Sequence, residues 1–155
     1  MNTQKGLMKV WMVSWFVLIG STVFADEDLR YAIIETAKQY QGVAYRYGTE
    51  SPNAFDCSGF VRYVYRMAAG IELPRTSKTI GASGQSVRIS EAQMGDVVIF
   101  ASQGVINHVA ILLDADSIIH AVSLGPKTGV IVSSLKDRYF GPRIIGVRSF
   151  LLSHE

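Results

Sequence analysis

The spacing of the apolar residues changes near Gly95, and this change constrains the fold more than any other feature of the sequence. Before it, apolar residues recur at helical spacing over residues 29–40, with acidic residues 26–28 at the start, and over residues 57–70. After it come short runs rich in valine and isoleucine, at 97–100, 109–113, 118–122, 130–132 and 144–150. Helices followed by strands predict an α+β domain with an antiparallel sheet.

The first 25 residues have the three-part pattern of an export signal. Lys5 and Lys9 precede an apolar run, residues 10–19, and small residues lead up to Ala25. An uncleaved membrane anchor is the alternative, but the run is shorter than the roughly 20 residues that cross a bilayer. We therefore expect residues 1–25 to be a signal peptide that is cleaved after Ala25.

Removing the signal balances the charge of the chain. The full sequence has 15 Lys and Arg against 13 Asp and Glu, and two lysines leave with the signal, so 13 minus 13 gives zero. This balance argues against a nucleic-acid partner or an anionic membrane surface. Residues 26–155 are then expected to form one monomeric domain without a membrane anchor, in the periplasm or outside the cell.

Cys57 is the single cysteine of a chain that is expected to be exported, so it has no partner for an internal disulfide. It lies where a loop meets the second predicted helix. The unpaired amides and the positive partial charge of a helix start favour a thiolate over a thiol, which is typical of a nucleophile. The alternative is a cysteine that simply packs in the core between Phe55 and Phe60.

His108 and His120 lie in two predicted strands joined by a turn at residues 114–116. Their spacing places them on one face of the sheet, opposite or diagonal to each other. A thiol, a base and a group that orients the base are what thiol hydrolysis requires. A zinc site of Cys57 and the two histidines is the alternative, but it lacks an acidic supporting residue and closely spaced ligands, so we expect neither metal nor cofactor.

Five short motifs follow one another through nearly all of residues 26–155, and they are Asp56-Cys57-Ser58-Gly59-Phe60, Leu73-Pro74-Arg75-Thr76-Ser77, Gly95-Asp96-Val97-Val98-Ile99-Phe100, His108-Val109-Ala110-Ile111 and Ile119-His120-Ala121. In this order they resemble the motifs of the NlpC-type cell-wall peptidases. The resemblance implies a compact papain-like fold in which the cysteine-bearing helix packs on the antiparallel sheet. It also implies a cysteine peptidase that cuts peptidoglycan stem peptides or muropeptide fragments between D-glutamate and diaminopimelate.

The resemblance also implies the role of individual residues. Cys57 would attack the scissile carbonyl, His108 would act as the base, and His120 would orient His108. Tyr45 would help the Cys57 amide to bind the developing oxyanion, although it could also be an ordinary half-buried aromatic residue.

Substrate contacts are expected from five residues that match family motifs. Arg75, Thr76 and Ser77 would offer a cation and hydroxyls to substrate carboxylates. Asp56 and Ser58 would also contact the substrate, although Asp56 could instead cap the helix.

The chain departs from the family at Ile80, where a glutamine is usual, and this puts the shape of the substrate pocket in question. Asp96 is interpreted as a structural turn residue, and the Gly- and Ser-rich stretch that follows Ser77, up to Ser86, is interpreted as a surface loop. Two other function classes stay open. One is an exported amidase or acyltransferase of the same fold, for instance an antagonist toxin, and the other is a wall-binding module without activity.

Overall fold

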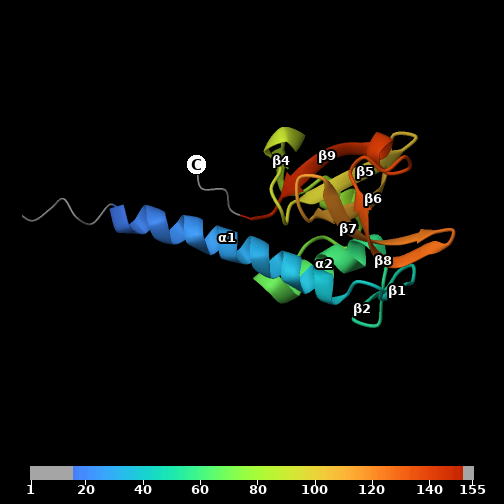
Figure 1. Ribbon diagram of the computed structural model, residues 1–155, viewed down its shortest axis with the longest axis horizontal. Helices are drawn as coiled ribbons and strands as arrows, with labels where there is room; N and C mark the ends of the chain where they lie inside the picture. The colour runs from blue at the N-terminus through green and yellow to red at the C-terminus, as the bar shows by residue number, and fades with distance from the viewer. Residues whose placement is uncertain (1–15, 152–155) are drawn as a thin grey trace, which may run out of the picture.

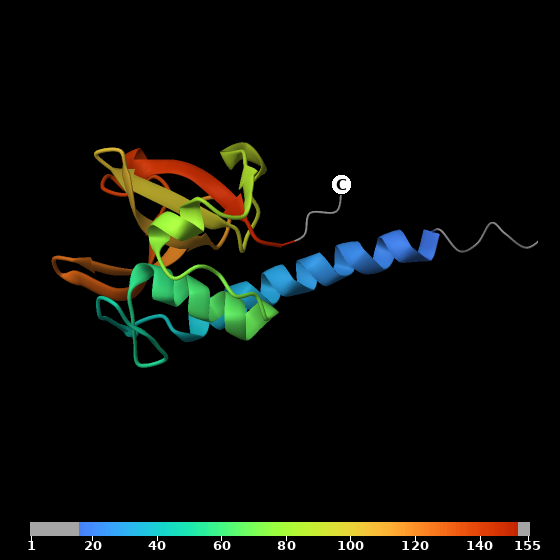
Figure 2. The same ribbon diagram turned by 180° about the vertical axis from the view of Figure 1, so that it is seen from behind.

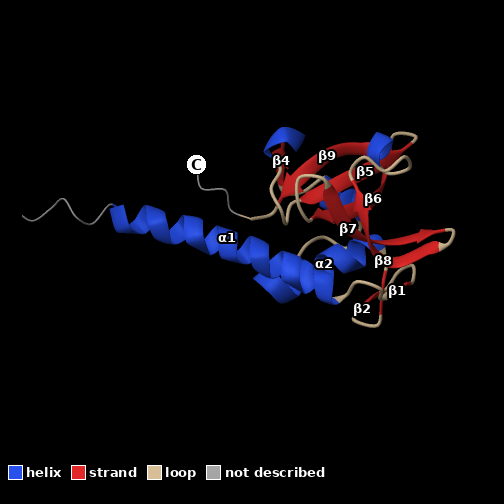
Figure 3. Ribbon diagram, viewed as in Figure 1, coloured by secondary structure: helices blue, strands red, loops and turns tan. Residues whose placement is uncertain are grey.

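The computed structural model describes the chain from residue 16 to residue 151, and its side chains from Asp26 on. Figure 3 shows its longer helices on one side and most of its strands on the other, with short helical turns beside the strands. The helices are α1 (Phe16–Gln39), α2 (Cys57–Ala69) and α3 (Ser77–Gly81), with short 3-10 turns η1 (Ile89–Glu91) and η2 (Gly141–Arg143). The strands are β1 (Ala44–Tyr45), β2 (Glu50–Ser51), β3 (Ala54–Phe55), β4 (Gln85–Val87), β5 (Val97–Ser102), β6 (Val105–Leu112), β7 (Ser117–Leu124), β8 (Lys127–Ser134) and β9 (Ile144–Ser149).

A six-stranded sheet with the order β4-β9-β5-β6-β7-β8 carries the fold, and all its neighbouring strands are antiparallel. A second, small sheet of order β1-β3-β2 lies beside α2. Figures 1 and 2 show α1 and α2 along one side of the large sheet, with β7 and β8 extending as a hairpin. The predicted α+β class with an antiparallel sheet is therefore confirmed.

The α2 helix confirms the second predicted helix at both ends. Asp56 caps its start by accepting a hydrogen bond from the Gly59 amide, and Gly70 ends it in the left-handed conformation with a φ of 67°. Phe60, Val61 and Val64 are fully buried on the face that packs against the sheet. The apolar spacing of this segment thus places the start of α2, with Cys57, against the sheet.

The α1 helix begins well before the predicted start at residues 26–28, so that boundary is wrong. No proline interrupts the sequence from residue 16 to residue 39, and the helix continues through it. Residues 1–15 of the predicted signal peptide lie outside the described part of the chain. In the part that is described, no helix combines the length and the apolar character that crossing a membrane requires.

Residues 77–87 also differ from the prediction of a surface loop. Thr76 caps the short helix α3 through a reciprocal pair of hydrogen bonds with Thr79, and β4 then pairs with β9 at the edge of the sheet. The serine and glycine content of this stretch gives neither α3 nor β4 a clear apolar pattern. Ile80 is the only large apolar side chain that α3 buries.

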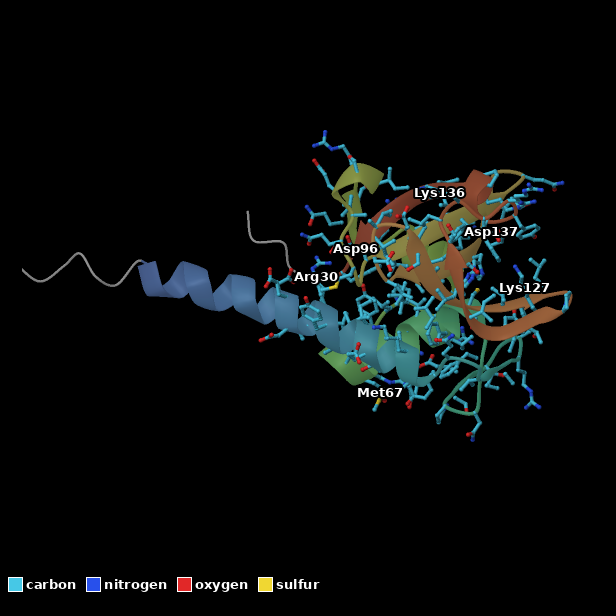
Figure 4. All side chains as sticks on the ribbon, viewed as in Figure 1. Arg30, Met67, Asp96, Lys127, Lys136 and Asp137 are labelled. Carbon is cyan, nitrogen blue, oxygen red and sulfur yellow. The ribbon has the colours of Figure 1, made fainter. Side chains whose placement is uncertain are left out.

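Arg30 ties α1 to the turn before β5. Its guanidinium lies 2.9 Å from the Asp96 carboxylate and donates to the Met94 carbonyl, while Asp26 pairs with it on the other side. Figure 4 shows the labelled Arg30 and Asp96 side by side where α1 passes the sheet. Because Asp96 is 1% exposed, its role is to position α1 and β5, as its interpretation as a structural residue expected.

Candidate active site

Cys57 is the first residue of α2, and its position follows from the residues around it. Asp56 caps the helix, and its amide donates to the Thr49 carbonyl. A Cβ atom at Gly59 would lie 2.4 Å from that same carbonyl oxygen, so only glycine fits there. The small residue two positions after Cys57 therefore lets the first turn of α2 dock against the loop before β2.

His108 and His120 come together at the open end of the β6–β7 hairpin. The two strands pair through Ile111 with Ile119 and Leu112 with Ile118, a register that puts the histidines diagonal to each other. The Nε2 atom of His108 lies 2.8 Å from the Nδ1 atom of His120. The predicted contact between these two side chains is confirmed.

A β-bulge precedes His108. The β5–β6 register shifts between Phe100, which faces His108, and Ala101, which faces Ile106, so Asn107 is the extra residue. A bulge turns the following side chain away from the direction that regular alternation would give it. The same strand also brings the Val109 amide within hydrogen-bonding reach of the Cys57 sulfur.

Ser133 and Phe140 hold the buried histidine. The Nε2 atom of His120, which is 0% exposed, lies 2.9 Å from the Ser133 hydroxyl on β8. The Phe140 ring packs against both imidazoles, with ring centroids 5.5 Å from His108 and 4.6 Å from His120. His120 therefore has a partner at each ring nitrogen, and this fixes its orientation.

One cleft of about 180 Å³ collects the predicted reactive groups. We call it the cysteine cleft. Its lining includes Tyr45, Cys57, His108, Tyr139, Phe140 and Arg143, and it contains no aspartate or glutamate. The start of α2 thus meets β1, β6 and the η2 region in a space that an extended peptide could enter.

Tyr45 lies in the cysteine cleft on strand β1 and is half-buried. Burial raises the pKa of its hydroxyl, and the nearby Cys57 and Asp56 raise it further. The hydroxyl therefore stays protonated and can donate a hydrogen bond to an oxyanion. Its half-buried position also matches the alternative interpretation of an ordinary aromatic residue.

The surroundings of the Cys57 thiol differ from the sequence expectation of a favoured thiolate. Burial raises the pKa of the thiol, and the Asp56 carboxylate adds to this effect. Hydrogen bonds from the amides of Ser58, Val109 and Cys57 itself oppose it. The helix start lowers the pKa as expected, but desolvation has the larger effect.

Both histidines are held in their neutral form. Burial lowers the pKa of His108 to about 4, and burial together with the charge of His108 lowers that of His120 to about 3. A neutral imidazole near a protonated thiol can act as a general base.

Asp56, Ser58 and Arg75 form a cluster of their own behind Cys57. Arg75 donates to both carboxylate oxygens of Asp56, at 3.1 and 2.8 Å, and to the Ser58 hydroxyl at 3.0 Å. Asp56 and Ser58 are 6% and 5% exposed, and neither lines the cysteine cleft. The charge of Arg75 is therefore already compensated by Asp56, and the helix-capping interpretation of Asp56 is confirmed. Its contact with substrate stays a prediction.

The remaining predicted contacts, Thr76 and Ser77, lie at the start of α3, outside the cysteine cleft. The Thr76 hydroxyl is bonded to Thr79 in the helix cap, and Ser77 begins the helix. Ile80, where the chain departs from the family, is fully buried in the core under α3 and does not line the cleft. Within the described part of the chain, no three acidic, histidine or cysteine side chains gather to hold a metal ion.

The residues of the site that the sequence analysis did not identify include Ser133, Tyr139, Phe140 and Arg143. Each comes from β8 or from the turn before β9, far from the motifs in sequence. A serine in an alternating strand and a Tyr-Phe pair before Gly141 and Pro142 carry no signal of their own, because only the β7–β8 and β5–β9 pairings bring them to the histidines.

Known proteins resemble this chain in sequence. The murein DD-endopeptidase MepS/murein LD-carboxypeptidase of Escherichia coli (strain K12) is 33% identical over 124 residues, which are 80% of this chain and 64% of that protein. The gamma-DL-glutamyl hydrolase of Bacillus subtilis (strain 168) is 36% identical over 121 residues, 76% of this chain and 29% of that protein. The chain thus spans less than two thirds of the length of these relatives.

Solved structures also resemble this chain in fold. An NlpC/P60 family protein from Bacillus cereus ATCC 10987 superimposes with a TM-score of 0.73 and 29% identity, over 82% of this chain and 40% of that one. The sequence profile of the NlpC/P60 family matches residues 42–149, a range that contains Cys57, both histidines and the whole lining of the cysteine cleft. This chain therefore belongs to the NlpC/P60 family.

Proposed function

We propose that the chain is a cysteine endopeptidase that hydrolyses stem peptides of bacterial peptidoglycan. One observation carries the proposal: Cys57 and His108 line the same cleft, and the Nε2 atom of His108 is already hydrogen-bonded to His120, at 2.8 Å. This leaves Nδ1 of His108 as the nitrogen available to the thiol. The relatives named as murein endopeptidase and gamma-DL-glutamyl hydrolase support the class of substrate.

The first half of the reaction is acyl transfer to Cys57. His108 takes the thiol proton on Nδ1 while the sulfur bonds to the scissile carbonyl carbon. The carbonyl oxygen becomes an oxyanion, and the Cys57 amide and the Tyr45 hydroxyl are the donors proposed to stabilise it. Because the resting thiol and imidazole are both neutral, the proton moves as the substrate is attacked.

The protonated His108 then gives its proton to the leaving amine, and the carbon–nitrogen bond breaks. A water molecule, deprotonated by His108, hydrolyses the thioester and regenerates the Cys57 thiol. In the tautomers that this mechanism requires, Nε2–H of His108 donates to Nδ1 of His120, 2.8 Å away, and Nε2–H of His120 donates to the Ser133 hydroxyl, 2.9 Å away. His120 and Ser133 thus act as positioning residues that hold the base in the useful tautomer.

We further propose that the bond cut is the one between D-glutamate and diaminopimelate, as the resemblance to the family implies. The relatives are named for DD-endopeptidase, LD-carboxypeptidase and gamma-DL-glutamyl hydrolase activities, so digestion of defined substrates has to decide which bond this chain cuts. Defined muropeptides should be treated with purified protein and the products identified by mass spectrometry. Cleavage only at the cross-bridge between stem peptides, or only at an amide bond outside the peptide, would contradict the proposed bond.

Export is the last part of the proposal. The signal pattern of residues 1–25 supports cleavage after Ala25, which would make Asp26 the first residue of the mature protein. The pair between Asp26 and Arg30 would survive this cleavage, as would the contact of Arg30 with Asp96. N-terminal sequencing of protein recovered from the periplasm or the culture fluid should begin at Asp26, and recovery of the chain with Met1 would contradict the proposal.

A further inference from the structure

Arg143 is a cation in the cysteine cleft whose charge is not compensated by the protein. Among the described residues, no carboxylate lies within ion-pair distance of it, and none lines the cleft. Asp137, the nearest acidic residue in sequence, accepts hydrogen bonds from the amides of Tyr139 and Phe140. Arg75 differs in this respect, because Asp56 already neutralises it.

The guanidinium of Arg143 is held in place rather than free to swing. Its carbon atom lies 3.9 Å from the centroid of the Tyr139 ring, and it donates a hydrogen bond to the Tyr139 carbonyl. Stacking leaves the edge of the planar group with further N–H donors for a carboxylate. An arginine oriented in advance loses less side-chain entropy when it binds an anion.

The position of Arg143 relative to the histidines indicates which half of a substrate it meets. Tyr139 packs on Phe140, with ring centroids 5.1 Å apart, and Phe140 packs on His108. His108 must lie beside the leaving amine to give it a proton. The residue that carries this amine is therefore on the same side of Cys57 as the η2 turn with Arg143.

We propose that Arg143, stacked on Tyr139, binds a carboxylate of the substrate residue on the leaving-amine side of the scissile bond. The inference rests on the proposed function and makes it more specific: the preferred substrate carries a free carboxylate on that residue. The sequence reasoning assigned carboxylate binding to Arg75, whereas the uncompensated cation of the cleft is Arg143.

Peptide pairs test this specificity. L-Ala-γ-D-Glu-diaminopimelate should be compared with two analogues, one amidated at the diaminopimelate carboxylates and one amidated at the free glutamate carboxylate. Arg143→Gln should lower kcat/KM about tenfold on the parent peptide, mainly through KM, because one charge-assisted hydrogen-bonding pair is lost. For the analogue amidated at the diaminopimelate carboxylates, Arg143→Gln should leave kcat/KM nearly unchanged. If the effect of Arg143→Gln on kcat/KM instead disappears when the glutamate carboxylate is amidated, the inference is overturned.

Arg138→Gln is the matched control, since Arg138 is exposed on the same connection and does not line the cleft. Figure 4 labels Lys136 and Asp137, the two residues directly before it on the connection from β8 to η2. This variant should keep the preference of the wild type. Circular dichroism of both variants should match the wild type, which confirms that they fold.

A second readout does not need peptide hydrolysis. Cys57 should be alkylated with iodoacetate, which is an anion, and with iodoacetamide, which is neutral. Arg143→Gln should lower the ratio of the two rates several-fold at low salt, whereas Arg138→Gln should not. If the wild type cleaves no peptide, the proposed function fails while this ratio still decides whether Arg143 attracts anions. An unchanged ratio, or an unchanged peptide preference where peptides are cleaved, overturns the inference.

Discussion

His108 and His120 share a hydrogen bond of 2.8 Å between Nε2 of the first and Nδ1 of the second, although their strands pair only near the turn. This contact occupies one nitrogen of His108 and leaves the other for chemistry. His120 is buried and meets Ser133 through its remaining nitrogen. The order of contacts from Ser133 to His120 to His108 leads to the cysteine cleft.

Replacing His120 should separate a working relay from simple packing. His120→Ala removes the group that orients His108, so kcat should fall by ~100-fold or more while KM changes little. His120→Gln should keep part of the activity, because a side-chain oxygen can accept from the same His108 nitrogen. Near-normal turnover in the alanine variant would reduce the mechanism to Cys57 and His108 alone.

Ser133→Ala should have a smaller effect of the same kind. The loss of one hydrogen bond, about 1 kcal/mol, corresponds to roughly a fivefold fall in kcat if the bond holds His120 in its useful tautomer. Ser134→Ala is the control, since Ser134 is exposed and contacts the Lys136 amide. Equal kcat values for the two variants would show that Ser133 does not position His120.

The histidine pair should make stability depend on pH. Their pKa values of about 4 and about 3 lie below the ordinary 6.5, so the unfolded chain binds more protons than the folded one between these limits. The free energy of unfolding should therefore keep its full value above pH 6.5 and fall as the pH drops toward 4, by an amount on the order of 3 kcal/mol for each histidine.

Denaturant unfolding at several pH values measures this effect. His120→Gln has one titrating group fewer, so its stability should fall less steeply with acid than that of the wild type. The carboxylates common to both proteins cancel in the comparison. Parallel curves for the two proteins would mean that His120 is not kept neutral by burial.

Thiol alkylation tests the resting state of the nucleophile. Burial raises the pKa of Cys57, so its reaction with iodoacetamide in the free protein should accelerate only above the ~8.5 of an ordinary thiol. A rate that is already at its plateau at neutral pH would instead show a thiolate paired with a charged His108. In that case the proton would have moved before the substrate binds.

The elements that were predicted correctly are those whose local sequence signals, such as helix caps and apolar runs, match the residues that the fold buries. Asp56 and Gly70 mark the ends of α2, and the fully buried Val109 and Ile119 lie within valine- and isoleucine-rich runs that form strands. The start of α1 was wrong because helix-compatible residues precede Asp26 without a break. In α3, threonines that cap a helix resemble the residues of a loop.

Only those residues of the site that lie within a recognisable local motif could be predicted from the sequence. Cys57 and the two histidines have distinctive chemistry and spacing, but Ser133 and Arg143 reach the site through the pairing of distant strands. The direction of the Cys57 pKa shift depends on how deeply the thiol is buried, and this is a property of the packed fold. The compensation of Arg75 by Asp56 likewise appears only once α2 and the loop before α3 are placed together.

The most direct test of the account is the rate at which Cys57→Ala releases product from a defined muropeptide that the wild type cleaves. Cys57 is half-buried at the end of a helix, and its replacement by alanine deletes one sulfur atom, so the variant should fold with a circular dichroism spectrum like that of the wild type. The account predicts that mass spectrometry then finds no hydrolysis product above the uncatalysed background. Turnover at the wild-type rate in this variant would contradict the role of Cys57 as the nucleophile.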